Sequence, residues 1–198
     1  MLLAIRGVGV LPRRSLAWIG ATVGTVVATF ARHKRERVLE NLRRAGSADP
    51  ERAVARSARA VARGMLDMLW LARRPAAETL RGVVVEGEHV LRAAAEEGRG
   101  VVLVGAHVGC WEAGPLAVAR SGLPVAAVAR PLGWDALDAY FATYRERGGV
   151  RTLLRGRPGA STAAYRCLRQ GGVLACMMDR ASGGRRIRVR FLGGGMDI

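Results

Sequence analysis

The sequence predicts an α/β fold with a mostly parallel sheet flanked by helices, preceded by an N-terminal helical region that associates with a membrane. From residue 81 onward, short apolar runs of strand length alternate with helical segments, as they do in βαβ units. Apolar and basic segments precede this alternation. Half of the 198 residues are apolar, which is enough to bury a hydrophobic core.

The first region, residues 1–31, reads as an apolar membrane anchor or a set of interfacial helices. The uncharged run 16–31 is bounded on both sides by basic residues. As a helix it would be about 24 Å long, shorter than the roughly 30 Å of a bilayer's hydrocarbon core. We therefore expect it to lie in the interface or to insert shallowly. A signal peptide and a buried core helix remain alternatives.

The second region, residues 32–80, is predicted to be basic and helical. A short basic helix is expected over residues 32–44. Asp49-Pro50-Glu51 then has the composition of a helix start, with a capping side chain, a proline in the first turn and an acid near the positive end of the helix dipole.

The third region, residues 81–198, is the predicted α/β core. Strands are expected at 83–85, 101–104, 124–129, 150–154 and 173–177, and helices at 88–97, 112–120, 135–147 and 160–169. Further on, Arg186, Arg188 and Arg190 alternate with apolar residues, so on a strand they share one face. That face is either an ordinary solvated edge or a basic stripe for phosphate groups.

The charge and the cysteines narrow the possible partners. Lys and Arg total 32 against 16 acidic residues, a formal net charge of +16, which indicates an anionic partner such as nucleic acid, anionic membrane lipids or an acidic carrier protein. Nucleic acid is not expected, because stacking aromatics are few and no binding motif is present. The three cysteines lack metal-ligand spacing, so we expect neither a metal site nor disulfides, and a reducing cytoplasmic setting.

The segment 105–112 carries the candidate chemistry. His107 follows a predicted buried strand, where ligands of parallel sheets bind. If the chain turns at Gly109, the carboxylate of Glu112 can approach one imidazole nitrogen and fix its tautomer, while the other nitrogen takes a proton from an attacking hydroxyl. The His-x4-Glu spacing alone is a weak signal, and a histidine satisfied by local hydrogen bonds is the competing interpretation.

Several landmarks in order resemble the bacterial lipid A late acyltransferase family. They are Arg32 to Asn41-Leu42, the segment 105–112, Ala129-Arg130-Pro131-Leu132 with Leu137-Asp138, Gly171-Gly172-Val173 leading to Asp179-Arg180, and Val189-Arg190-Phe191-Leu192-Gly193. The resemblance implies transfer of a fatty acyl chain from acyl carrier protein or coenzyme A to a hydroxyl of a glycolipid, at the cytoplasmic face of the bacterial inner membrane.

The resemblance also implies roles for individual residues. His107 would be the general base and Glu112 its orienting acid, with no covalent intermediate, metal or cofactor beyond the acyl donor. Arg130 would bind phosphate or stabilise the oxyanion. Asp179 follows a predicted buried strand, so it is expected at the carboxyl edge of the sheet beside the acceptor, unless it only caps a turn. Arg130, Asp179 and Arg180 are the expected substrate-binding set.

The sequence departs from the family pattern in ways that leave other readings open. Ala106, Cys110 and Arg180 replace commoner glycine, asparagine and glutamine, which affects acceptor identity more than reaction type. Relatives continue well past residue 193, so we expect a truncated or frameshifted reading frame, or a fragment. The alternatives are a glycerolipid acyltransferase, an inactive remnant and a non-enzymatic basic membrane-binding module.

Overall fold

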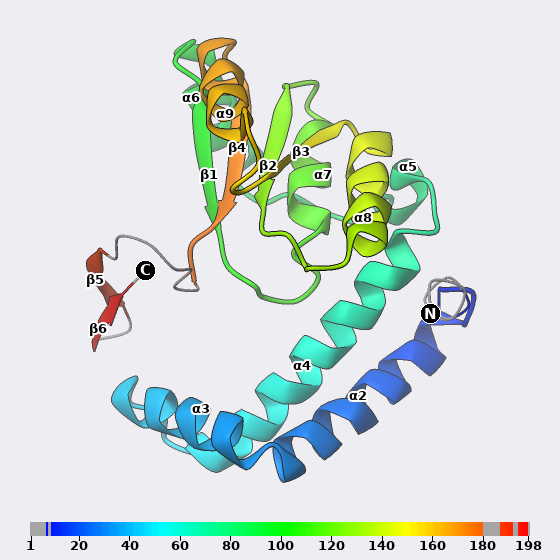
Figure 1. Cartoon of the computed structure of the whole chain (residues 1–198), viewed down its shortest axis with the longest axis vertical. Coiled ribbons are helices and arrows are strands. Elements are labelled where there is room, and N and C mark those ends of the chain that lie inside the picture. Colours follow the sequence, from blue (N-terminus) through cyan, green and yellow to red (C-terminus); the bar gives the residue numbers. More distant parts are fainter. Residues whose placement is uncertain (1–6, 8, 180–186, 192–193, 198) are drawn as a thin grey trace.

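The computed structural model describes Gly7 and residues 9–179, 187–191 and 194–197. An arm of helices leads into an α/β lobe (Figure 1). The arm consists of α2 (Arg13–Phe30), α3 (Arg32–Arg44) and α4 (Pro50–Leu71). Helix α4 runs from the lobe to the far end of the arm, and α2 runs alongside it. The short helix α5 (Ala76–Thr79) then joins the arm to the lobe.

Two glycines one helical turn apart let α2 lie directly against α4. A Cβ atom added at Gly24 would lie 2.5 Å from Cα of Arg59, and one at Gly20 would lie 2.9 Å from Cα of Arg63. Both contacts are with backbone, which a side-chain rotation cannot relieve. Small residues at such a helix crossing permit close approach of the two backbones, so the spacing of these glycines sets the packing of the arm.

We expect Gly24→Leu to destabilise the arm by about 1–3 kcal/mol, the usual cost of overpacking a tight contact. Leucine favours helix formation by roughly 1 kcal/mol over glycine, so a measured loss would reflect the helix crossing and not α2 itself. Thermal unfolding in detergent should show a midpoint several degrees lower. Val23→Leu, on an exposed position of α2, is the matched control. Equal midpoints for the two variants would contradict the tight crossing.

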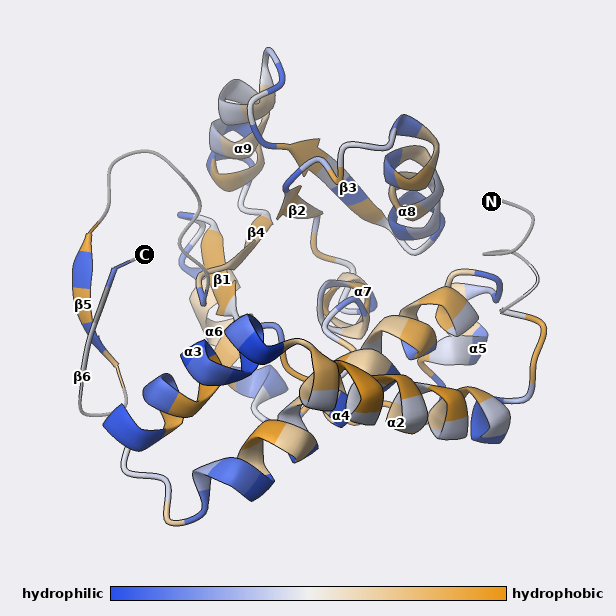
Figure 2. Ribbon diagram, turned by 60° about the horizontal axis from the view of Figure 1, so that its bottom comes forward, coloured by the Kyte–Doolittle hydropathy of each residue, from blue (hydrophilic) through white to orange (hydrophobic). Residues whose placement is uncertain are grey.

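Much of the surface of α2 is apolar and exposed. Trp18 is 77% exposed and Phe30 78%, and Ile19, Val23 and Val26 are exposed between them. Figure 2 shows this apolar composition along α2, in contrast to the hydrophilic α3. The buried residues of α2 are only Leu16, Gly20 and Gly24, which contradicts the alternative of a helix buried in the core.

Helices α2 and α3 meet at a sharp bend. No single helix among the described residues is long and apolar enough to cross a membrane, although α2 and α3, bent by 92° at their junction, together meet that criterion on length and composition. The predicted start of α4 is confirmed. The side chain of Asp49 accepts a hydrogen bond from the backbone N–H of Arg52 at 3.0 Å, and Pro50 opens the helix.

The predicted α/β fold is confirmed. Four parallel strands form the sheet in the order β1-β4-β2-β3, with bounds β1 Val101–Gly105, β2 Val125–Ala129, β3 Val150–Leu154 and β4 Val173–Met177. The connecting helices are α6 (Glu88–Glu96), α7 (Ala113–Ala119), α8 (Asp135–Arg147) and α9 (Ala160–Arg169). Val150 and Val173 of the sheet and Leu116 of α7 are almost fully buried and centre the core.

Two further segments, residues 83–85 and the segment around Arg188, were considered as strands from the sequence. The strand predicted at residues 83–85 is wrong: the structure has no strand there, and Val83 and Val85 pack against the core while Val84 is 85% exposed. A run of three residues between two turns can bury alternate side chains without forming a ladder. The alternating segment around Arg188 and Arg190 forms a strand, β5 (Arg188–Phe191), which pairs antiparallel with β6 (Gly194–Asp197). Arg186 lies outside the described residues.

Candidate active site

The order of the strands brings His107 and Asp179 together. Strands β1 and β4 are neighbours, and their register pairs Gly105 with Met177 at the carboxyl ends. The backbone N–H of Met178 then donates to the carbonyl of Gly105 at 3.1 Å, which keeps the two segments that follow β1 and β4 side by side beyond the last strand pair. His107 and Asp179 each lie two residues past the end of their strand, so they lie next to each other at the carboxyl edge of the sheet.

The carboxylate of Asp179 holds His107 at two points. One oxygen, Oδ2, accepts the backbone N–H of His107 at 2.9 Å, and Oδ1 lies 2.7 Å from Nδ1 of the imidazole. Burial acts to raise the pKa of Asp179, but the hydrogen bonds from the backbone and ring of His107 and the charge of the imidazole outweigh it, so the pKa lies below its ordinary value. The ionised carboxylate only accepts hydrogen bonds. Nδ1 therefore carries the proton and Nε2 presents a lone pair.

Glu112 has a different partner from the one its spacing suggested. Only 6% exposed, its carboxylate is bound through both oxygens by Arg145 of α8, with Nε to Oε2 at 2.7 Å and Nη2 to Oε1 at 2.5 Å. Among the described residues its hydrogen bonds are to Arg145 and none is to the imidazole. Glu112 immediately precedes α7, so its side chain ties the end of the histidine loop to α8.

The loop that carries His107 packs closely against helix α4. A Cβ atom at Gly64 of α4 would lie 2.4 Å from the carbonyl oxygen of Gly109. Gly109 has φ of +59°, a left-handed conformation that glycine adopts more easily than other residues. The loop therefore turns at the predicted position and rests directly on the backbone of the arm.

Cys110 is the nearest potential nucleophile in sequence to His107. Burial, together with the negative charge of Asp67, raises the pKa of its thiol to about 11. The thiolate is the reactive form, so at neutral pH this cysteine is not an activated nucleophile.

Arg130 lies at the same edge of the sheet, immediately after β2. Its loop is closed by Asp138, whose two carboxylate oxygens each accept the backbone N–H of Leu132 at 3.1 Å. The side chain of Arg130 is exposed, and it forms no ion pair among the residues that the structure describes. Its guanidinium is thus available to an anionic group, whereas Arg180 lies outside the described residues.

Exposed apolar side chains surround this edge. Val108 of the histidine loop, Leu132 of the Arg130 loop and Met178 beside Asp179 are all exposed, and Val108 is 77% accessible. Large apolar groups left in water at the mouth of a polar site are typical of a surface that meets lipid or another apolar partner. The site therefore combines a polarised histidine, a free arginine and an apolar rim.

Two of these relationships were missed by sequence reasoning. The contact between Asp179 and His107 follows from a non-sequential strand order, and only the equal two-residue step after each strand pointed to it. Arg145 had no signal of its own, because the sequence contains many arginines and this one lies 33 residues from Glu112.

No curated protein matches the chain. The family model of the bacterial lipid A biosynthesis acyltransferases matches residues 1–195, which covers the helical arm, the sheet and every site residue described above. The chain therefore belongs to the bacterial lipid A biosynthesis acyltransferase family, whose members are acyltransferases.

Proposed function

We propose that this protein transfers a fatty acyl chain from a thioester donor, acyl carrier protein or coenzyme A, to a hydroxyl of a lipid A-like glycolipid at the cytoplasmic face of the inner membrane. The observation that carries this proposal is the hydrogen-bonded pair of His107 and Asp179 at the carboxyl edge of the sheet. Family membership gives acyl transfer as the reaction type.

His107 acts as the general base in the proposed reaction. Nε2 accepts the proton of the acceptor hydroxyl while its oxygen attacks the thioester carbonyl carbon, which gives a tetrahedral oxyanion. The C–S bond then breaks, and the imidazolium returns the proton to the departing thiolate. Asp179 keeps Nδ1 protonated and stabilises the imidazolium, and the product is an ester and a free thiol.

Two further side chains have supporting roles. Arg130 is the candidate for the oxyanion or an acceptor phosphate, since its guanidinium is exposed at the same edge and carries no ion pair within the described part of the chain. A single well-placed donor of this kind is worth about 3 kcal/mol of transition-state stabilisation. Glu112 acts as a positioning residue, because it anchors the histidine loop to α8 through Arg145.

Membrane association is part of the same proposal. The exposed apolar side of α2, the basic helix α3 that follows it and the apolar rim of the site favour a surface that lies against anionic membrane lipids. The acidic acyl carrier protein, as donor, is the second proposed partner, and the net charge of +16 suits both.

The proposal is tested by incubating the full chain in mixed micelles with a labelled acyl donor, either acyl carrier protein that carries a long-chain fatty acid or a long-chain acyl-coenzyme A. The acceptor is either a glycolipid with free hydroxyls or a lysophosphatidic acid. We expect a new glycolipid ester, detected by mass spectrometry and removed by alkaline hydroxylamine, which cleaves esters and leaves amides. His89→Ala, an exposed histidine on α6, is the control that keeps activity.

The acceptor separates the candidate functions. Transfer to lysophosphatidic acid and not to the glycolipid would identify a glycerolipid acyltransferase instead. No transfer from either donor to either acceptor, by a protein that unfolds cooperatively, would favour the inactive remnant or the non-enzymatic membrane-binding module.

A further inference from the structure

A basic groove runs along the helical arm, away from the histidine site. It lies between α2 and α4 and has a volume of about 560 Å³. Arg56, Arg59 and Arg63 of α4 form one wall, and Trp18, Thr22 and Thr25 of α2 contribute to the other. We refer to it as the α2–α4 groove.

None of the three arginines has an acidic partner in the part of the chain that the structure describes. They follow one another at intervals of three and four residues, so they lie on one side of α4 and repel each other. The two acids of α4 are already paired: Glu51 with Arg35 and Asp67 with Arg13. Within the described residues, none of the three groove arginines forms an ion pair. The groove therefore holds three positive charges, and an anion would relieve their repulsion.

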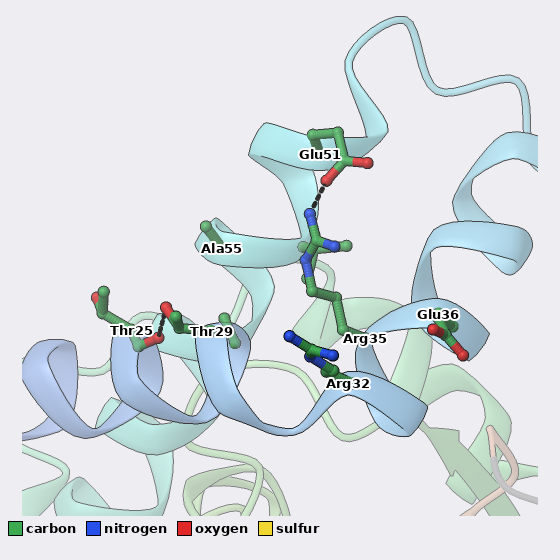
Figure 3. Close-up of a pocket in the computed structure, with 9 residues that line it drawn as sticks. Thr25, Thr29, Arg32, Arg35, Glu36, Glu51 and Ala55 are labelled. Carbon is green, nitrogen blue, oxygen red and sulfur yellow. Dashed lines mark hydrogen bonds and ion pairs between the residues drawn. The ribbon is translucent and has the colours of Figure 1, made fainter.

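A neighbouring pocket of about 610 Å³ provides an internal comparison (Figure 3). It also contains arginines, but Arg35 reaches Glu51 there, and Glu36 is a second acid in its lining. Its positive and negative charges therefore balance. The α2–α4 groove has no acid in its lining, so the uncompensated positive charge is concentrated in the groove and not in the pocket.

The donors in the groove are guanidinium groups. The hydroxyls of Thr22 and Thr25 donate to backbone carbonyls of their own helix. Arg63 uses its Nε–H on the carbonyl of Ala17 at 3.2 Å, which leaves its terminal N–H groups for a ligand. Forked guanidinium groups suit the oxygens of a phosphate, which they can bind in pairs.

The surroundings of the groove identify the source of that phosphate. Trp18 lines the groove and is 77% exposed, and α2 carries further exposed apolar residues outside the groove lining, namely Ile19, Val23 and Phe30. Tryptophan is enriched at the level of lipid headgroups. A helix that inserts an apolar side and flanks it with arginines lies in the plane of the membrane interface. A phosphate group held at the level of the headgroups would be that of a phospholipid.

We propose that the α2–α4 groove binds the headgroup phosphate of an anionic phospholipid and so holds α2 in the interface. This inference rests on the membrane location proposed above, but it is independent of the chemistry at His107. Its occupant is a lipid of the bilayer and not the acyl acceptor.

The test compares two triple variants that remove the same charge. The groove variant is Arg56→Gln/Arg59→Gln/Arg63→Gln. The control variant replaces three exposed arginines of α8 and α9, Arg147→Gln/Arg166→Gln/Arg169→Gln. Binding is measured by co-sedimentation with vesicles of phosphatidylcholine alone and with equimolar phosphatidylglycerol. Circular dichroism and thermal unfolding establish that both variants are folded.

Each arginine near an anionic surface contributes about fivefold to binding, so we expect the groove variant to lose on the order of 100-fold in affinity for the phosphatidylglycerol vesicles. The control variant should stay close to wild type. Equal losses in both variants would mean that only the total charge matters and would overturn the proposal, as would wild-type binding by the groove variant.

Two further arms separate the alternatives. If the folded groove variant keeps its vesicle binding but loses binding to acyl carrier protein, the groove is a protein-docking site and the proposal fails. It fails equally if inorganic phosphate raises the unfolding midpoint of the wild type alone while vesicle binding is unaffected by the substitutions. Acyl transfer in mixed micelles is measured in parallel: its absence in the wild type would contradict the proposed function and leave the groove result standing.

Discussion

Replacing Asp179 with asparagine is expected to slow acyl transfer by about 10²- to 10⁴-fold with little change in folding. The amide can still occupy the space beside His107, but it offers an N–H as well as an oxygen and no negative charge. The imidazole then loses both the fixed tautomer and the anion that stabilises its protonated form. Turnover under saturating donor, measured with the micellar assay, reports the effect.

A double-variant cycle makes this prediction specific. His107→Ala should lose activity to at least the same extent, and His107→Ala/Asp179→Asn should be no slower than His107→Ala alone, because groups that act as one unit are not additive. A fully additive double variant would show that Asp179 acts elsewhere, for instance on the acceptor.

The pattern of apolar runs was sufficient to predict the class of fold. Four of the five expected strands form, and all four are parallel. Continuous apolar runs carry this signal because the strands of a parallel sheet are usually covered on both faces. The run 101–104 forms its strand, but the expectation that this strand is buried is wrong, because β1 lies at the edge of the sheet with Val102 55% and Val104 62% exposed. The run 83–85 has the same composition but makes no ladder. Local propensity cannot decide whether a short run finds a neighbouring strand, because pairing depends on distant parts of the chain.

The sequence predicted which residues lie at the candidate site better than it predicted which of them contact one another. His107, Arg130 and Asp179 all lie at the carboxyl edge of the sheet, as expected of residues that follow parallel strands. Which of them touch depends on strand order, and β4 lies between β1 and β2 although it is the last of the four sheet strands in sequence. Spacing along the chain favours Glu112 as the partner of His107, because it counts separation in sequence and ignores neighbours across the sheet.

The partner of Glu112 could not be predicted from the sequence for the same reason, because it depends on contacts between distant parts of the chain. Its buried carboxylate needs a cation, and any of the many arginines could supply it by composition alone. The structure selects Arg145 because α8 packs beside the loop that precedes α7, and its last turn directs that side chain inward. This pairing gives Glu112 a structural task that can be separated from catalysis by experiment.

Glu112→Gln is expected to destabilise the fold by about 3–5 kcal/mol, a large share of the roughly 5–15 kcal/mol that stabilises a typical domain. The substitution leaves the guanidinium of Arg145, only 12% exposed, without its anion. Urea unfolding measures the loss. Glu146→Gln makes the same chemical change at an exposed position of α8, one residue from Arg145, and should change stability by less than about 0.5 kcal/mol.

Removing both charges separates positioning from chemistry. In Glu112→Met/Arg145→Met the buried pair is replaced by apolar side chains, which is often neutral for stability because no charge remains uncompensated. We expect this double variant to recover most of the stability lost in Glu112→Gln, and to recover acyl transfer with it, because the histidine loop is again anchored to α8. A double variant that is stable yet inactive, beside a Glu112→Gln variant as stable as Glu146→Gln, would instead assign Glu112 to the chemical step.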